Sequence, residues 1–140
     1  MIRTKDINII NDALKYCHKN KNTSKYTMVA LLVRGKNILS VGKNNYRKTN
    51  PKTPQIKEYL LPRHAEVDCI SRYIVKNRKI TDDMTLYVVG ITQGKNCRPV
   101  ISSKPCDSCM ECIRKHKIKR VVYCDYLKNE FTIKEMEIEK

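Results

Sequence analysis

The sequence contains no tryptophan, a single phenylalanine and only four glycines among its 140 residues. Its longest apolar run, Met28 to Val33, falls far short of the roughly 20 residues that a membrane-spanning helix needs. The N-terminal segment carries asparagine and aspartate where a secretory signal peptide would have its apolar stretch. No Gly/Ser-rich linker, repeat or break in composition interrupts the chain, whose length suits one core. We therefore expect one cytoplasmic domain over residues 1–140, without a transmembrane segment.

Acidic residues are scarce as well, since 14 Asp and Glu stand against 29 Lys and Arg and leave a formal net charge of +15. Excess positive charge favours phosphate-bearing partners through long-range attraction, but it does not separate a nucleotide from RNA or DNA. The competing interpretation is a lysine-rich solvated surface, because lysine is commonly exposed in any protein. Aromatic side chains that would stack on the bases of a strand are few, with eight Tyr beside the single Phe.

Cysteine, in contrast, is well represented, and its count of seven is odd. Without a secretion signal a disulfide framework is not expected, whereas metal ligation or reduced core cysteines are. A free cysteine buried in a core behaves as a small apolar residue. We interpret most of the cysteines in that way, namely Cys17, Cys69, Cys97, Cys112 and Cys124.

Apolar residues recur with helix and strand periodicities along most of the chain. These periodicities predict, in order, helix 5–18, strands 26–34 and 38–41 joined by a turn at 35–37, a helix from Pro62 to about Asn77, strand 85–92, a helix after Pro105 and strand 120–123. Residues 42–61 lack periodicity and form a predicted long loop, and such loops are usually functional or mobile. The order of elements predicts an α/β fold, a three-layer α/β/α sandwich around a single mixed five-stranded sheet.

The fifth strand of that sheet is expected in the C-terminal segment. Only 15 residues follow Asp125, and a parallel connection needs a crossover of a dozen or more before its strand begins. Apolar residues alternate there, at Phe131, Ile133, Met136 and Ile138. We therefore expect a strand that returns antiparallel across a turn at residues 128–130, with a short terminal helix as the alternative.

Two short motifs carry the chemistry, H-x-E at His64–Glu66 and P-C-x-x-C at Pro105–Cys109. Each is expected to open a helix that precedes a buried strand. Residues three apart on a helix share one face, so Cys106 and Cys109 can reach one ion together with His64. The positive ends of both helices would help to keep the thiolates ionised. Three protein ligands and an open fourth position are typical of catalytic zinc, whereas structural zinc sites have four protein ligands.

Together the two motifs resemble the cytidine and deoxycytidylate deaminase superfamily of zinc-dependent nucleobase deaminases. RHAEVDCI is similar to the first metal motif of the family, SKPCDSCMECI to its second, and IKRVVYCD to the strand that follows. The resemblance implies the fold of that family and a Zn²⁺ cofactor bound by His64, Cys106 and Cys109. It also implies that Glu66 is not a ligand but a proton shuttle between zinc-bound hydroxide and the leaving amine.

The resemblance extends to residues that would contact substrate. Gly42-Lys43-Asn44 is similar to the Gly-x-Asn that ends the second strand in relatives, where the asparagine contacts the nucleoside sugar. By the same resemblance, the backbone around Ala65 binds the base carbonyl and Ser103 lines the pocket. The loop before His64 supplies candidate phosphate contacts at Arg47, Lys48, Lys52 and Lys57.

Three functions are compatible with these residues. The first is hydrolytic deamination of cytosine in a free (deoxy)cytidine nucleotide or nucleoside, of the dCMP type, to uracil and ammonia. The second applies the same chemistry to cytosine in single-stranded DNA or RNA, or with less support to adenosine in tRNA. The third is a non-catalytic, zinc-stabilised module that binds nucleic acid, against which an intact Glu66 argues. Relatives are often oligomers, so a homo-oligomer is expected by analogy alone.

The sequence also departs from the family pattern. Deoxycytidylate deaminases typically have a longer C-terminal region and often a second zinc site, for which no convincing His/Cys cluster is found here. Cys112 extends the second motif to C-x-x-C-x-x-C and could complete a closed, inert Cys₃His site. Cys106 and Cys112 are six residues apart, about 240° around a helix, so they are expected to face different sides.

Overall fold

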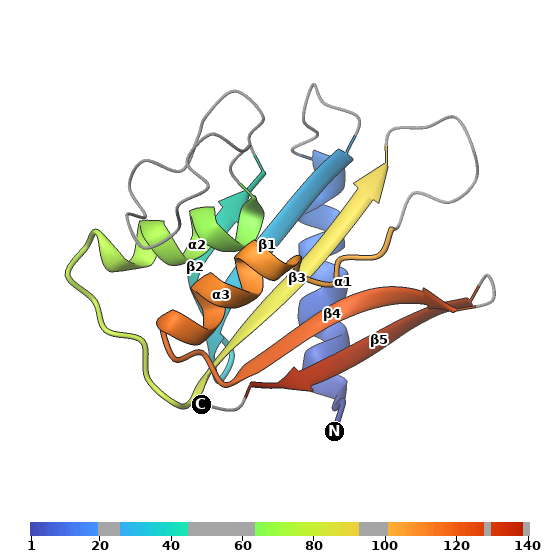
Figure 1. Ribbon diagram of the computed structural model, residues 1–140. Helices are drawn as coiled ribbons and strands as arrows, with labels where there is room; N and C mark the ends of the chain where they lie inside the picture. Colours follow the sequence, from blue (N-terminus) through green and yellow to red (C-terminus); the bar gives the residue numbers. More distant parts are fainter. Residues whose placement is uncertain (20–25, 45–63, 93–100, 128–129, 139–140) are drawn as a thin grey trace.

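A mixed sheet of five strands forms the middle layer of the protein in the computed structural model, which describes residues 1–19, 26–44, 64–92, 101–127 and 130–138 (Figure 1). The strands are β1 (Tyr26–Arg34), β2 (Asn37–Lys43), β3 (Met84–Thr92), β4 (Arg120–Leu127) and β5 (Glu130–Glu137). The helices are α1 (Thr4–Lys19), α2 (Ala65–Ile74) and α3 (Asp107–Lys115). The α/β/α sandwich predicted from the order of elements is confirmed.

The strands follow the spatial order β2-β1-β3-β4-β5. β1 pairs antiparallel with both β2 and β3, while β3 pairs parallel with β4. Helix α3 lies in the connection between those two parallel strands, as a crossover requires. β3 is the central strand, and consecutive residues along it are buried on both faces of the sheet, as its continuous apolar sequence predicted.

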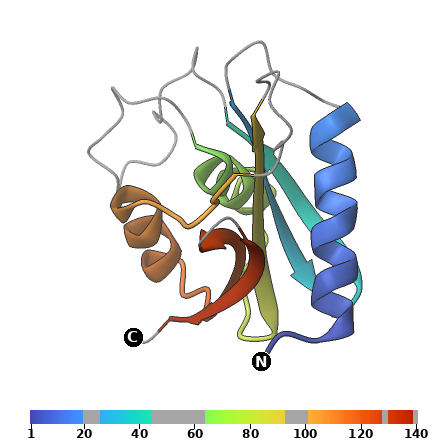
Figure 2. The same cartoon turned by 90° about the vertical axis from the view of Figure 1, so that its right-hand side faces the viewer.

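Helix α1 covers one face of the sheet, and α2 and α3 cover the other, as the side view in Figure 2 shows. Ile10 and Cys17 of α1 belong to the same apolar cluster as Tyr87 of β3. Ile70 of α2 and Ile113 of α3 belong to a second cluster, on the opposite face. Because α2 and α3 cover the same face of the sheet, their N-termini can lie close together at one end of the strands.

The buried stripe of α1 differs from the expected one. The spacing predicted an inner face of Ile7, Ile10, Leu14 and Cys17. Ile7 is instead 42% exposed, whereas Asp6 and Ile9 are buried. The reason is that the Asp6 carboxylate faces the sheet, where it binds Arg120 and Tyr87.

The C-terminal segment returns as β5 and pairs antiparallel with β4, which confirms the predicted fifth strand and contradicts the terminal-helix alternative. The register runs from Arg120 opposite Glu137 to Leu127 opposite Glu130. Residues 128 and 129 of the predicted turn lie outside the described residues. β5 is an outer strand of the sheet, at the opposite end from β2.

The core cysteines behave as the composition suggested. Cys17, Cys69, Cys112 and Cys124 are buried and free, while Cys97 lies outside the described residues. Within the described part of the chain, no helix combines the length and apolar character needed to cross a membrane.

Helix α2 lies directly on the end of β2. A Cβ atom at Gly42 would come within 2.3 Å of both the Ala65 carbonyl oxygen and the Cys69 nitrogen, so only glycine fits there. Ser40 Oγ donates a hydrogen bond to the Cys69 carbonyl at 2.8 Å. Strand β2 therefore continues to Lys43, two residues past its predicted end at Val41, because α2 packs along it.

Candidate active site

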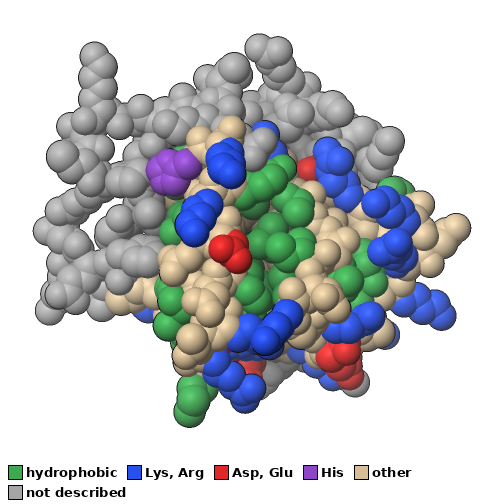
Figure 3. All heavy atoms as spheres, turned by 180° about the vertical axis from the view of Figure 1, so that it is seen from behind, with side chains coloured by type: hydrophobic (Ala, Val, Ile, Leu, Met, Phe, Trp, Pro, Cys, Tyr) green, Lys and Arg blue, Asp and Glu red, His purple; other side chains and the backbone are tan. Residues whose placement is uncertain are grey.

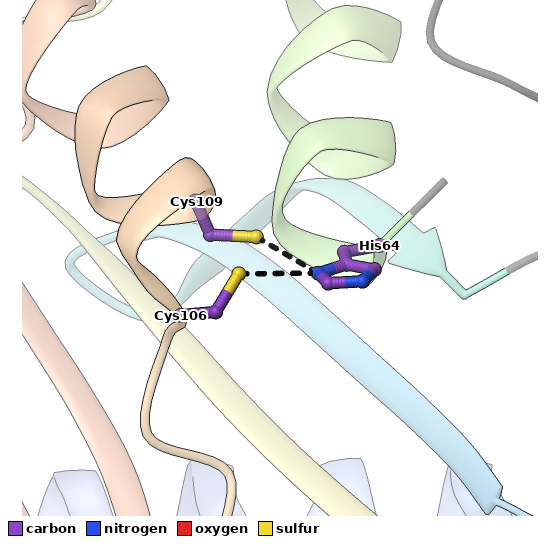
Figure 4. Close-up of side chains that lie close together, drawn as sticks. All are labelled: His64, Cys106 and Cys109. Carbon is purple, nitrogen blue, oxygen red and sulfur yellow. Dashed lines mark hydrogen bonds between the residues drawn. The ribbon is translucent and has the colours of Figure 1, made fainter. Parts of the chain in front are cut away.

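The N-termini of α2 and α3 carry the residues of the two motifs. His64 precedes α2 and Cys106 precedes α3, each as the N-cap residue with an extended backbone. Neither side chain makes a capping hydrogen bond to its own helix. Figure 4 shows both side chains directed toward a common point, which the Cys109 side chain approaches from the first turn of α3.

The three side chains form a compact cluster of one nitrogen and two sulfur atoms. His64 Nδ1 lies 3.3 Å from Cys109 Sγ and 3.4 Å from Cys106 Sγ. All three atoms lie within 4.8 Å of one another. Zinc–sulfur bonds of about 2.3 Å and zinc–nitrogen bonds of about 2.0–2.1 Å at tetrahedral angles would place the nitrogen about 3.6 Å from each sulfur. The cluster therefore fits a tetrahedral Zn²⁺ ion in donor type and in spacing.

Cys112 does not join this cluster. Its sulfur lies 3.7 Å from His116 Nδ1, one turn further along α3. In the described part of the chain, His64, Cys106 and Cys109 form the only group of three or more candidate ligands. The closed Cys₃His alternative thus has no geometric support, whereas three protein ligands are typical of catalytic zinc.

The pKa values of the two cysteine thiols in the cluster, Cys106 and Cys109, are shifted in opposite directions. A hydrogen bond from Cys109, followed by one from His64, lowers the pKa of the Cys106 thiol to about 3. The same bond to Cys106, together with burial, raises the pKa of Cys109. A divalent cation bound by both sulfur atoms would displace their remaining protons, because thiolates are the ligands that bind the metal.

Glu66 lies beside the cluster in the first turn of α2. Its side chain is 4% exposed and forms a hydrogen bond with Cys109. Burial raises the pKa of the Glu66 carboxyl, and a backbone hydrogen bond and the nearby His64 offset only part of that effect. A carboxyl in this setting holds a proton more readily than a surface carboxylate does, which suits a group that takes up and returns a proton.

The sequence profile of the cytidine and deoxycytidylate deaminase zinc-binding region matches residues 3–125. The chain belongs to the cytidine and deoxycytidylate deaminase family. The matched residues include the whole cluster, and the cofactor of this zinc-binding family is Zn²⁺. Membership supports a hydrolytic deaminase as the class of enzyme. None of the curated proteins matches the chain.

Solved structures of two proteins share the fold of this deaminase. Cytidine deaminase from Burkholderia pseudomallei superposes with a TM-score of 0.57 at 17% identity, over 91% of this chain and 90% of that one. The dCMP deaminase of cyanophage S-TIM5, solved in complex with dCMP and dUMP, gives a TM-score of 0.55 at 18% identity, over 86% of this chain and 81% of that one. At these identities the likeness shows the fold alone.

In this deaminase, Asn44 lies at the end of β2 and is held by β1. Its backbone N–H donates to the Met28 carbonyl at 3.2 Å, and its Oδ1 accepts the Met28 N–H at 2.8 Å. The residue is 3% exposed. These bonds fix the place of Asn44 in the sheet, and its contact with a sugar stays a prediction.

Ser103 and Ala65 also occupy defined positions. Ser103 Oγ donates to the Val88 carbonyl at 2.6 Å and accepts the Cys124 N–H at 2.9 Å, so the hydroxyl joins β3 to β4. These two hydrogen bonds give Ser103 a structural role. Its place in the wall of the substrate pocket stays a prediction. Ala65 is the buried first residue of α2, with its carbonyl against Gly42.

The predicted phosphate contacts belong to the segment between β2 and α2. Arg47, Lys48, Lys52 and Lys57 lie outside the described residues. Their role therefore stays a prediction from sequence.

Sequence reasoning missed one residue beside the site. Asp68 is 6% exposed, and its Oδ2 accepts the Lys43 N–H at 3.0 Å and the Arg72 Nε–H at 2.9 Å. The available signal was a second acidic residue, two positions after Glu66 and directly before the apolar residues Cys69 and Ile70.

Proposed function

We propose that the protein hydrolyses the exocyclic amine of cytosine in a free (deoxy)cytidine nucleotide or nucleoside, of the dCMP type. One water molecule is consumed, the cytosine becomes uracil, and ammonia is released. The observation that carries this proposal is the buried Glu66 carboxyl beside the cluster of His64, Cys106 and Cys109. A purely structural zinc site has no need of such a carboxyl.

The roles in the reaction follow from these positions. Zinc, when bound to His64, Cys106 and Cys109, would lower the pKa of water toward about 7 and so supply the nucleophile at neutral pH. Glu66 takes one proton from the attacking water and gives it to the ring nitrogen, and then takes the second proton from the new hydroxyl group and gives it to the amine, which leaves as ammonia. Because Glu66 is buried, each proton stays within the site while Glu66 carries it.

Asn44 and the backbone at Ala65 would orient the substrate. Asn44, fixed at the end of β2 by its bonds to Met28, would bind the sugar hydroxyl. The backbone at Ala65, which begins the same helix that carries Glu66, would bind the base carbonyl. A substrate held at sugar and base presents its amine-bearing carbon to the nucleophile in one orientation, which is a large source of rate.

A second candidate substrate is cytosine in single-stranded DNA or RNA, and the net charge of +15 favours it. On the α1 face, Lys and Arg side chains are spread around the surface with few acidic side chains among them, and they do not form a single stripe (Figure 3). The metal cluster lies on the other face of the sheet, and aromatic side chains that would stack on the bases of a strand are few in this chain, with one Phe and no Trp. We therefore place the free nucleotide first.

A deamination panel tests both candidates. Purified, zinc-loaded protein would be incubated with cytidine, deoxycytidine, CMP, dCMP, dCTP, single-stranded DNA and RNA, and the adenine counterparts. Release of ammonia from dCMP or deoxycytidine at the highest kcat/KM supports the proposal. Preference for a strand selects the second candidate, and preference for adenine contradicts the cytosine assignment.

A fully zinc-loaded, folded protein that releases no ammonia from any compound would contradict catalysis altogether. Tight binding of nucleic acid by such a protein would then favour the non-catalytic module.

A further inference from the structure

We propose that Asp68 is a positioning residue for substrate binding, which fixes Asn44 relative to Glu66 by holding the backbone of Lys43. This inference rests on the proposed function, because it assumes that Asn44 binds the sugar of a nucleotide. Asp68 would act indirectly, through the end of β2, because its carboxylate binds the backbone N–H of Lys43 there.

The Asp68 carboxylate joins two elements that carry different parts of the site. Asp68 belongs to α2, and its Oδ2 accepts the backbone N–H of Lys43, the last residue of β2, at 3.0 Å. β2 is an outer strand of the described sheet, and no other strand of the described residues pairs with its free side. At this end of β2, a side chain of α2 provides the hydrogen bond that a neighbouring strand would otherwise provide.

Asn44 follows Lys43 directly and is bound from the other side. Its backbone N–H and its Oδ1 both bond to Met28 of β1, at 3.2 and 2.8 Å. Gly42, on the other side of Lys43, lies against the first turn of α2 with no room for a Cβ. Residues 42–44 are therefore held between β1 and α2, with the Asp68 bond at their centre.

Glu66 and Asp68 lie on the same rigid turn of α2. Two residues are about 200° apart around a helix, so Glu66 faces the metal cluster while Asp68 faces β2. A shift of Lys43 away from Asp68 would move Asn44 relative to Glu66 by a similar amount. Misplacement of a substrate-binding group by about 1 Å can cost about 10²-fold in rate.

The neighbouring ion pair does not account for the burial of Asp68. Arg72, one turn along α2, bonds to the same Oδ2 atom at 2.9 Å, but its side chain is 63% exposed. Because water surrounds most of the Arg72 side chain, its attraction to Asp68 is screened and contributes little to stability. Arg72 therefore offers a matched control, because Arg72→Ala removes the ion pair and leaves the Lys43 bond intact.

The test compares Asp68→Ala, Asp68→Asn and Arg72→Ala for kcat, KM, zinc content and Tm. Asp68→Ala should raise KM for the preferred nucleoside or nucleotide by about tenfold or more, with zinc retained. Asp68→Asn keeps an oxygen that can accept the Lys43 N–H, so its KM should stay within about threefold of wild type. Arg72→Ala should match wild type. A merely structural role would lower the active fraction, and hence kcat, without changing KM.

A double-mutant cycle with Asn44→Ala adds a second readout. If Asp68 acts through Asn44, Asp68→Ala should raise KM little further in the Asn44→Ala background. An unchanged KM in zinc-loaded Asp68→Ala, or fully additive effects in the cycle, would overturn the inference. Should the double variant not fold, backbone amide exchange in Asp68→Ala decides: faster exchange at Lys43 and Asn44 supports the inference, and unchanged exchange overturns it.

The same exchange measurement separates this inference from the proposed function. Wild-type protein that deaminates none of the compounds would contradict the function. Unchanged amide exchange would contradict the positioning role, whatever the activity.

Discussion

Arg120 of β4 holds the carboxylate of Asp6 through two hydrogen bonds, Nη1 to Oδ1 at 3.0 Å and Nη2 to Oδ2 at 2.9 Å, across 114 residues of chain. Tyr87 of β3 donates its hydroxyl to Asp6 Oδ1 at 2.5 Å, and the Arg3 N–H donates to Oδ2. Burial alone would raise the pKa of Asp6, but the bonds from Arg120, Tyr87 and Arg3 outweigh it and hold that pKa well below its usual range. One carboxylate thus anchors α1 to two strands, on the face of the sheet opposite the metal cluster.

Replacing Asp6 should destabilise the protein without altering its chemistry. Asp6→Ala removes the acceptor that Asp6 offers to the Tyr87 hydroxyl and, within the described residues, leaves Arg120 with Glu135 alone as its ion-pair partner, which we expect to cost about 2–4 kcal/mol. Urea unfolding at pH 7 measures the loss. Lys15→Ala, at an exposed position of the same helix, is the control and should change stability by less than about 0.5 kcal/mol.

The contribution of Asp6 should also depend on pH. Since its pKa is lower in the folded protein than in the unfolded chain, its stabilisation is present above the unfolded value of about 3.9 and is lost as the pH falls below it. The difference in unfolding free energy between wild type and Asp6→Asn should therefore narrow below about pH 4. A difference that stays constant from pH 7 to pH 3 would show that the carboxylate charge contributes nothing.

Metal content should be about one zinc ion per chain. The reason is the single cluster of His64, Cys106 and Cys109 within the described residues. Cys106→Ala should lose metal and stability together, because metal binding is coupled to folding. Cys112→Ala is the matched control and should retain zinc, since Cys112 lies outside the cluster. Elemental analysis that finds no zinc in purified, active protein would exclude this site as the catalytic centre.

Glu66→Ala should retain zinc and fold but lose activity. Proton transfer by a positioned carboxyl contributes roughly 10²–10⁴ in rate, so kcat should fall by at least about 10². Elemental analysis and Tm establish that the metal and the fold persist. Glu111→Ala, on the exposed side of α3, should keep full activity. Activity of Glu66→Ala within about tenfold of wild type would remove Glu66 from the mechanism.

Gly42→Ala should disturb the site through the backbone. The added Cβ would come within 2.3 Å of two backbone atoms of α2, at Ala65 and Cys69, and backbone atoms cannot turn aside. We expect a loss of about 1–3 kcal/mol in stability and reduced activity, because α2 carries Glu66. Gly90→Ala is the comparison, since its nearest obstacle is the flexible Met28 side chain, which can move. Equal costs for both variants would contradict this distinction.

Charge reversal in the loop before His64 should identify the phosphate contact, if the substrate is a mononucleotide. Among Arg47, Lys48, Lys52 and Lys57, one residue should then matter strongly. Its reversal should raise KM for dCMP and barely alter KM for deoxycytidine, which carries no phosphate. For a strand substrate several should matter modestly, with a steep salt dependence from counterion release. If neutralising all four changes no kcat/KM, the loop takes no part in recognition.

The metal cluster was predictable from sequence because its information is local. The spacing of Cys106 and Cys109 within one helix turn sets their common direction, and a histidine at a second helix start completes the set. The antiparallel β5 was predictable because the segment after Asp125 is too short for a crossover. In both cases, chain length and helix geometry leave few alternatives.

Other features depend on partners distant in sequence, and the sequence did not reveal them. The spacing of apolar residues placed Ile7 in the buried stripe of α1, whereas the structure buries Asp6 and leaves Ile7 exposed. Only the position of Arg120 in the folded sheet explains the difference. The contact of Asp68 with Lys43 is of the same kind, because it depends on how closely α2 approaches β2 at Gly42.

An ion shared by the starts of α2 and α3 also joins two distant parts of the chain. His64 and Cys106 are 42 residues apart, so a common ion closes a loop of that length in the folded protein. The ion is released when the chain unfolds, so its free energy of binding adds directly to the stability of the folded state. Within that loop lie β3 and the long segment before α3. The ion would therefore tie the antiparallel half of the sheet to the β3–α3–β4 crossover, and this constraint would operate whether or not any nucleotide is bound.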